Sequence, residues 1–258
     1  RRGISHLDLV EPRVRTLEAT MLAWSPGTRG PVRGSVVALP HITDTQELTD
    51  FLTGVRGQFV LLTAPEPSCR PEDSWEQWST PASRARHQVE LDSTRADWID
   101  RARSTGASSL GELSEMLEVA GAVGILSSEW SRGWGVEKVF SAVTQVIPQV
   151  DVSCEDYGLL WRLAVRGQGP VVRLEADAEP LGEVSVANTI GVIRGSELPD
   201  EYVLLSAHFD SWDGASGATD NGSGTVLMME VMRILQRVYP RPKRTILAGH
   251  WNGEEQGL

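Results

Sequence analysis

Three short clusters of potential metal ligands follow one another in the last third of the sequence. His208 and Asp210 form the first, Asp220 stands in the second, and the third holds Glu254 and Glu255. A histidine together with several carboxylates is the kind of ligand set that hydrolytic zinc sites use. The residue types therefore predict a zinc centre with hydrolytic chemistry.

The residues of these clusters have distinct roles in such a centre. His208 would bind metal through one ring nitrogen, and Asp210 would hold the ring in orientation. Asp220 carries two carboxylate oxygens that could bridge two ions. Glu254 and Glu255 point in different directions from one loop, so that Glu255 could bind metal while Glu254 activates water as a general base.

Each position also has an ordinary structural interpretation. His208 could be a histidine in a turn, Asp220 could be the N-cap of the following helix, and the two glutamates could form a solvated acidic turn. His250 lies within the preceding apolar run, where we expect a buried histidine rather than a ligand. His41 and His87 lie far upstream, and we expect both at the surface. The coincidence of three clusters favours the metal site.

The elements around the clusters predict a scaffold that brings them to one place. Residues 188–193 and 202–207 are short apolar runs separated by a polar turn, as in neighbouring strands, and residues 245–249 form a third run. Between the last two runs, apolar residues recur on one face of a predicted helix: Leu227, Val231, Ile234, Leu235 and Val238. The order strand, helix, strand is typical of a parallel sheet covered by helices. Ligands bind such sheets beyond the carboxyl ends of the strands, where the first and third clusters lie.

The sequence before residue 181 predicts a separate α+β unit. Apolar runs of strand length alternate with helical patterns, and the clearest helices are residues 110–120, which end at Gly121, and residues 154–165. Residues 70–108 are rich in charged residues and tryptophan, and they predict a partly helical surface insertion. We therefore expect an N-terminal segment over residues 1–30, an α+β domain over 31–180 and part of an α/β domain over 181–258.

The composition restricts the partners of the chain. Its 258 residues carry 24 Lys and Arg against 35 Asp and Glu, a net charge of −11, and they contain no long basic run. Nucleic acid and anionic membranes are therefore disfavoured as partners. No stretch approaches the roughly 18 consecutive apolar residues of a membrane span.

The two cysteines carry little information. Cys69 and Cys154 lie far apart and form no Cys-x-x-Cys pair, which excludes a zinc ribbon and a dithiol redox motif. A disulfide between them is possible, and two unpaired thiols are the simpler interpretation.

The three clusters, together with their neighbours, resemble the co-catalytic zinc exopeptidase family of bacterial aminopeptidases and plasma glutamate carboxypeptidase. The resemblance rests on residues 208–213, 217–224 and 251–258, and it is strongest to the carboxypeptidase Q branch. Residues 32–179 resemble the protease-associated domain inserted in that branch, although residues 70–108 exceed the usual connection. The implied fold is α/β, a mixed, mostly parallel sheet sandwiched by helices and incomplete in this chain, with an inserted α+β protease-associated domain.

The resemblance implies a role for each candidate residue. It implies that His208 binds one zinc ion, that Asp220 bridges two, that Glu255 binds the second, that Glu254 acts as general base and acid, and that Asp210 supports His208. A hydroxide held between the two zinc ions would attack a terminal bond of a peptide or dipeptide. The family also uses an Asp and a His further downstream, so we expect this chain to be a C-terminally truncated fragment that is inactive alone.

The resemblance further implies an extracytoplasmic or secreted protein and a possible homodimer. Aminopeptidase, carboxypeptidase and dipeptidase activity are left open. Two other functions are alternatives: a non-catalytic binding or receptor module of the same architecture, and a glutaminyl cyclase with one zinc ion. The intact His208, Asp220 and Glu255 argue against the receptor, and the protease-associated insertion disfavours the cyclase.

Overall fold

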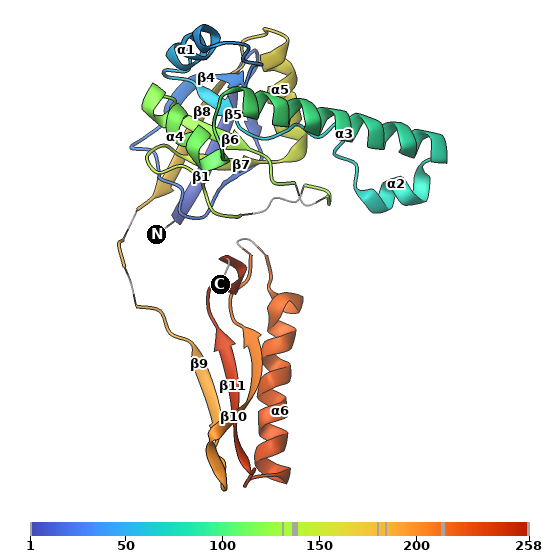
Figure 1. Ribbon diagram of the computed structural model, residues 1–258, viewed down its shortest axis with the longest axis vertical. Helices are drawn as coiled ribbons and strands as arrows, with labels where there is room; N and C mark the ends of the chain where they lie inside the picture. The colour runs from blue at the N-terminus through green and yellow to red at the C-terminus, as the bar shows by residue number, and fades with distance from the viewer. Residues whose placement is uncertain are drawn as a thin grey trace. The chain divides into compact units, whose positions relative to one another are not determined.

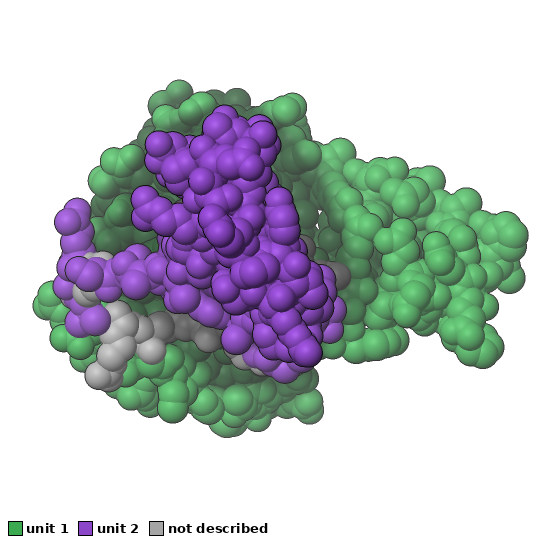
Figure 2. All heavy atoms as spheres, turned by 90° about the horizontal axis from the view of Figure 1, so that it is seen from below, with its two compact units in different colours: residues 1–180 green, residues 181–258 purple. Residues whose placement is uncertain are grey.

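The computed structural model describes residues 2–130, 132–135, 139–179, 181–183, 185–212 and 215–256. The chain divides into two compact units, residues 1–180 (unit 1) and residues 181–258 (unit 2), which Figure 1 shows as ribbons and Figure 2 in two colours. Each unit has its own sheet, and each is described by itself.

Unit 1 is built on a mixed eight-stranded sheet in the order β2-β1-β8-β4-β5-β6-β7-β3. The three adjacent pairs from β4 to β7 are parallel, and the other pairs are antiparallel. The first 30 residues supply three of these strands. The strands are β1 Arg2–Glu11, β2 Arg15–Leu17, β3 Ala19–Met21, β4 Val32–Ala38, β5 Phe59–Leu61, β6 Gly124–Ser127, β7 Gln149–Val152 and β8 Val171–Ala178.

Helices pack against the sheet of unit 1 through two separate apolar cores. The helices are α1 Thr45–Gly54, α4 Leu110–Ala120 and α5 Cys154–Val165, and the last two match the predicted helices. Alternate residues of a strand point to opposite faces. Phe59 therefore packs in the core that contains Leu160 of α5, whereas Val60 packs in the core that contains Leu117 of α4. Gly121 ends α4 with a φ of 92°, a left-handed conformation that glycine adopts without strain.

The predicted insertion forms two helices, α2 Glu72–Trp78 and α3 Pro81–Ser104, which project from the rest of unit 1 (Figure 1). Thr80 caps α3, because its side chain accepts a hydrogen bond from the Ser83 N–H, and Pro81 occupies the first turn, where a missing N–H costs nothing. The segment is thus helical over most of its length, which is more helix than the partly helical segment predicted from the sequence.

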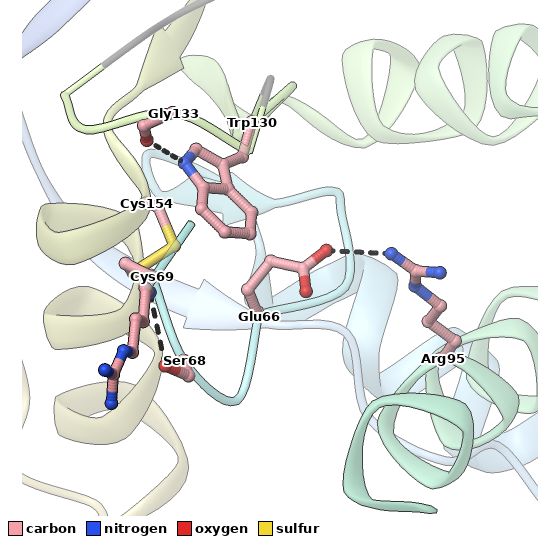
Figure 3. The surroundings of a disulfide bond; sticks show 8 residues. Glu66, Ser68, Cys69, Arg95, Trp130, Gly133 and Cys154 are labelled. Atoms are coloured by element: carbon pink, nitrogen blue, oxygen red, sulfur yellow. Dashed lines mark hydrogen bonds and ion pairs between the residues drawn. A yellow bond between two sulfur atoms is a disulfide. The ribbon is translucent and has the colours of Figure 1, made fainter. Parts of the chain in front are cut away.

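A disulfide joins Cys69, just before α2, to Cys154 at the start of α5, with their Cα atoms 5.7 Å apart (Figure 3). The interpretation of the cysteines as two unpaired thiols is therefore wrong. The two residues are 85 positions apart in sequence, so only the tertiary fold brings them together.

Unit 2 contains a three-stranded sheet in the order β10-β11-β9. Strands β10 and β11 are parallel, and α6 between them packs against the sheet, which confirms the predicted strand, helix, strand unit (Figure 1). Strand β9 pairs antiparallel with β11 and not with β10, so the expectation that residues 188–193 and 202–207 are neighbouring strands is wrong. The elements are β9 Thr189–Ile193, β10 Leu198–His208, α6 Gly224–Val238 and β11 Arg244–Trp251, with short helical turns at Ala218–Ser223 and Glu254–Gln256.

The chain therefore has a mixed α/β fold, as predicted. In unit 2, α6 lies along the sheet while several apolar side chains of the strands, including Val192, Val203 and Leu204, are exposed. No helix among the described residues is both long enough and apolar enough to cross a membrane.

Candidate metal centre

His208 is the last residue of β10, and its ring is held through the Nδ1 atom. It is buried, and Thr225 at the start of α6 donates a 3.0 Å hydrogen bond from Oγ1 to the His208 carbonyl. The His208 Nδ1 atom lies 3.0 Å from the carbonyl oxygen of Asp210, so this nitrogen carries the proton when the ring is neutral. The lone pair of Nε2 is then free to bind a metal.

The acidic residues of the second and third clusters lie at the His208 Nε2 atom. This nitrogen is 3.1 Å from Asp220 Oδ1 and 3.5 Å from Glu254 Oε2. His208, Glu254 and Glu255 each offer one ligand atom, and these three atoms lie within 4.8 Å of one another. The end of β10 and two separate turns, Ala218–Ser223 and Glu254–Gln256, therefore bring these side chains to one point.

Asp220 lies in the turn Ala218–Ser223 and not at the cap of α6, whose N-cap residue is Ser223. Its backbone is extended, with φ −112° and ψ 98°, and its side chain is mostly exposed. The interpretation of Asp220 as an N-cap is therefore wrong. The structure places its carboxylate against the His208 ring instead.

Asp210 connects the first and third clusters. Its Oδ2 atom accepts a 3.0 Å hydrogen bond from the Glu255 N–H, and its Oδ1 atom lies 3.4 Å from His208 Nδ1. Burial alone would raise the pKa of Asp210. Hydrogen bonds from the backbone N–H groups of Glu255, Asp210 and Glu254, together with the charge of His208, have a larger opposite effect, so the pKa of Asp210 is lowered. Asp210 is therefore a stable carboxylate that holds two loops in register.

Glu255 is the more buried of the two adjacent glutamates. Its Oε1 atom is buried without a hydrogen-bond partner among the described residues. Burial first, and then the negative charges of Asp220 and Glu254, raise the pKa of Glu255, although Trp212 and His208 partly oppose this. The side chain of Glu254 is half-exposed and open to solvent. The two side chains thus occupy different environments.

His208 responds to the same surplus of negative charge. Burial lowers its pKa, yet the carbonyl of Asp210 and the carboxylates of Glu254, Asp210 and Asp220 outweigh burial, so the pKa of His208 is raised. A divalent cation would compensate this surplus, and it would give the orphaned Glu255 Oε1 a partner. The imidazole nitrogen of His208 and the carboxylates of Asp220 and Glu255 are suitable donors for zinc. The residues present therefore fit the metal.

The three histidines that the sequence placed outside the metal site are either buried or in unit 1. His250 is buried, as predicted, and its ring stacks on Phe209 with the centroids 4.9 Å apart. His41 and His87 lie in unit 1, where His41 pairs with Asp97 at 2.8 Å. Within the motifs that carry the resemblance, positions 213, 257 and 258 lie outside the described residues.

The sequence reasoning missed Thr225, whose hydroxyl fixes the end of β10. Its only signal was a hydroxyl residue in the first turn after the Gly-rich cluster.

The C-terminal part of the chain, within unit 2, carries the match to a known family. Residues 188–258 match peptidase family M28. Over 256 residues the chain is 28% identical to carboxypeptidase Q of Mus musculus, an alignment that covers 99% of this chain and 48% of that protein. It is 36% identical over 151 residues to a probable glutamate carboxypeptidase of Arabidopsis thaliana, which covers 50% of this chain and 21% of that protein. The chain thus spans about half the length or less of these curated relatives, and the predicted resemblance is confirmed.

Solved structures share the fold. A peptidase M28 precursor from Shewanella amazonensis superposes with a TM-score of 0.59 at 24% identity, covering 100% of this chain and 53% of that one. A zinc aminopeptidase from Bacillus subtilis gives a TM-score of 0.56 at 18% identity, covering 98% of this chain and 50% of that one.

Proposed function

We propose that the protein containing this chain is a zinc-dependent exopeptidase, a metalloprotease that hydrolyses terminal bonds of peptides or dipeptides. The observation that carries the proposal is the convergence of His208, Asp220, Glu254 and Glu255 beyond the ends of two parallel strands. The match of residues 188–258 to peptidase family M28 and the similarity to carboxypeptidase Q support a peptidase.

His208, Asp220 and Glu255 would hold the metal. His208 presents Nε2, and Glu255 offers a buried oxygen that has no hydrogen-bond partner in the part of the chain that the structure describes. Asp220 has two oxygens with which it could bridge two zinc ions. When bound, zinc would polarise the peptide carbonyl and make water a better nucleophile at neutral pH.

Glu254 is the candidate for proton transfer. Its half-exposed carboxylate can be reached by water and substrate, whereas the more buried Glu255 is suited to a fixed ligand role. Glu254 would take a proton from the attacking water on one carboxylate oxygen and pass it to the leaving amine. Asp210 contributes to catalysis only by orienting His208 and the Glu255 loop.

The location and partners of the protein follow from the same proposal. The disulfide between Cys69 and Cys154 supports an extracytoplasmic or secreted protein, because disulfides persist in oxidising compartments. The partner would be a peptide or dipeptide substrate. The homodimer implied by the resemblance stays a prediction.

Peptidase assays on the native protein that contains this chain test the proposal. We expect zinc-loaded protein to hydrolyse dipeptides, and Glu254→Gln to lower kcat about 10²- to 10⁴-fold while zinc content is unchanged. Glu197→Gln is the matched control, because Glu197 is an exposed glutamate near the opposite end of β10. Turnover retained in Glu254→Gln would overturn the assignment of the base.

The same assay separates the alternative functions. Cyclisation of an N-terminal Gln peptide without dipeptide hydrolysis would identify a glutaminyl cyclase. Zinc-loaded native protein that turns over neither substrate would identify a binding or receptor module.

A further inference from the structure

The α2–α3 insertion encloses a cavity in unit 1 that has no part in the metal centre. The cavity has a volume of about 150 Å³, and it lies between α2, α3 and the loops that carry Glu66 and Trp130. Its lining combines tryptophan rings with guanidinium groups, and the residues that matter here are Arg70, Trp75, Arg84, His87, Leu91 and Trp130.

The aromatic part of the lining is held in place by contacts within unit 1. The rings of Trp75 and His87 stack with centroids 4.3 Å apart and planes 8° from parallel, and the Arg70 guanidinium lies 5.2 Å from the Trp75 ring centroid. Trp130 donates a 2.8 Å hydrogen bond from Nε1 to the Gly133 carbonyl, beside the disulfide of Cys69 (Figure 3). The two tryptophan rings of the lining are therefore fixed in position before any ligand binds.

Two arginines of the lining are already neutralised by glutamates. Arg95 pairs with Glu66 at 3.1 Å, and Arg132 pairs with Glu72 at 2.8 Å (the first pair is drawn in Figure 3). These pairs account for two of the three carboxylates around the cavity, the third being the exposed Glu76.

The other two arginines have no carboxylate partner among the described residues. Arg84 donates to the carbonyl oxygens of Trp75 at 3.2 Å and Glu76 at 2.9 Å, and Arg70 donates to the Ser74 hydroxyl at 2.8 Å. These contacts orient both guanidinium groups without neutralising them. In a chain of net charge −11, the lining of this cavity therefore has a local surplus of positive charge.

We propose that this cavity binds a small organic anion that has a flat aromatic body and a carboxylate. A cavity of about 150 Å³ is of the size that holds a benzene ring. Arginine donors match a carboxylate in geometry as well as in charge, and Trp75, Trp130 and Leu91 would contact the ring. A free aromatic acid and the C-terminal aromatic residue of a peptide share this chemistry.

A neighbouring hollow leaves room for a longer ligand. It has a volume of about 470 Å³ and shares Arg84 and Gln88 with the cavity. A peptide bound by its C-terminal aromatic residue could therefore extend past Arg84 into this hollow, whereas a free aromatic acid would occupy the cavity alone. The two kinds of ligand should therefore bind with different affinities.

Calorimetric titration of the unsubstituted chain tests the charge and shape that the site requires. Benzoate, benzamide and benzylamine have nearly the same shape and differ in charge. We expect benzoate to bind at least about tenfold more tightly than the other two. Equal or tighter binding of benzylamine would overturn the proposal, and so would the absence of saturable benzoate binding in the millimolar range.

Two arms of the titration distinguish the sources of the ligand. N-acetyl-Ala-Phe with a free carboxylate is compared with its C-terminal amide and with benzoate. Tighter binding of the acid than of benzoate indicates a peptide terminus, and the reverse order indicates a free aromatic acid. Binding of the amide as tight as that of the acid would contradict the requirement for a carboxylate.

A pair of variants on α3 tests the residue assignment. Arg84→Gln should weaken benzoate binding about tenfold or more, whereas Arg86→Gln should not, because Arg86 is exposed and does not line the cavity. Circular dichroism verifies that both variants keep their helices, and Arg70→Gln repeats the test if Arg84→Gln does not fold. Unchanged affinity in a folded Arg84→Gln or Arg70→Gln variant would overturn the assignment.

Discussion

The Asp210 carboxylate accepts a 3.0 Å hydrogen bond from the backbone N–H of Glu255, and this bond ties the loop after β10 to the loop after β11. The two strands are parallel neighbours, with His208 paired to Trp251, so both loops leave the same edge of the sheet. Because the Asp210 carbonyl also lies 3.0 Å from His208 Nδ1, one residue fixes the positions of two proposed metal ligands.

Replacing Asp210 should weaken zinc binding without removing a ligand. Asp210→Asn keeps the shape of the side chain but removes the negative charge that supports His208. We expect the zinc affinity of the chain to fall about 10- to 100-fold, the usual cost of losing such a supporting carboxylate. Competition with a chelating dye measures this. Asp200→Asn, at an exposed position of β10, is the control, and equal affinity of the two variants would contradict the role of Asp210.

The core under α4 should be sensitive to the loss of side-chain volume. Leu117 is 0% exposed and Val119 on the same helix is 81% exposed. Leu117→Ala should lower the free energy of unfolding by about 3 kcal/mol, because it removes buried methyl groups and leaves a cavity. Val119→Ala should change it by less than about 0.5 kcal/mol. Urea denaturation of unit 1 separates the two, and similar losses in both variants would contradict the placement of α4.

The disulfide should stabilise unit 1 by lowering the conformational entropy of the unfolded chain. Cys69 and Cys154 enclose a long segment, with a sequence separation of 85. We expect the Cys69→Ser and Cys154→Ser double variant to lose about 2–4 kcal/mol of unfolding free energy. A reducing agent should destabilise the wild type by a similar amount and leave the double variant unchanged. If reduction has no effect on the wild type, the two cysteines are not paired.

Tyr157 should make unit 1 less stable at high pH. Its hydroxyl is buried, donating a 2.6 Å hydrogen bond to the Thr63 carbonyl and accepting one of 2.9 Å from the Thr63 N–H. Burial raises the pKa of Tyr157 well above its usual value of 10.0, although the bonds to Thr63 partly oppose this. At a pH between 10.0 and the raised pKa, the Tyr157 hydroxyl is ionised in the unfolded state but keeps its proton in the folded state. The free energy of unfolding should therefore fall by about 1.4 kcal/mol per pH unit from this residue.

Tyr157→Phe is the variant that isolates this contribution. It has no hydroxyl to titrate, so the difference in unfolding free energy between wild type and variant should shrink as the pH rises above about 10. Urea denaturation at a series of pH values measures the difference. A difference that stays constant with pH would contradict the raised pKa of Tyr157.

Local periodicity in the sequence predicted most of the scaffold of the site. The helices over residues 110–120 and 154–165 have the predicted bounds, because capping residues and apolar spacing are local signals. The parallel pair β10 and β11 followed from the strand, helix, strand order, and it brought the His208 and Glu254 loops to one edge.

Features that depend on distant residues were not predicted. Strand β9 lies beside β11, because β11 enters the sheet between two strands that are consecutive in sequence. Strand β10 begins at Leu198, which lies in the turn predicted between the two apolar runs. Leu198 already pairs with Arg244 of β11, and the register then shifts before Tyr202. The pairing of Cys69 with Cys154 and the bond from Thr225 to His208 arise only in the folded chain.

His208, Asp220 and Glu255 would hold zinc in unit 2, with Glu254 beside them. Equilibrium dialysis of the metal-free chain against zinc, with elemental analysis, tests this directly. We expect the wild type and the control His41→Ala to bind zinc alike, because His41 lies in unit 1, and His208→Ala to bind it at least about tenfold more weakly. A wild type that binds no zinc, or a His208→Ala variant that binds it as tightly as the wild type, would contradict the proposed centre.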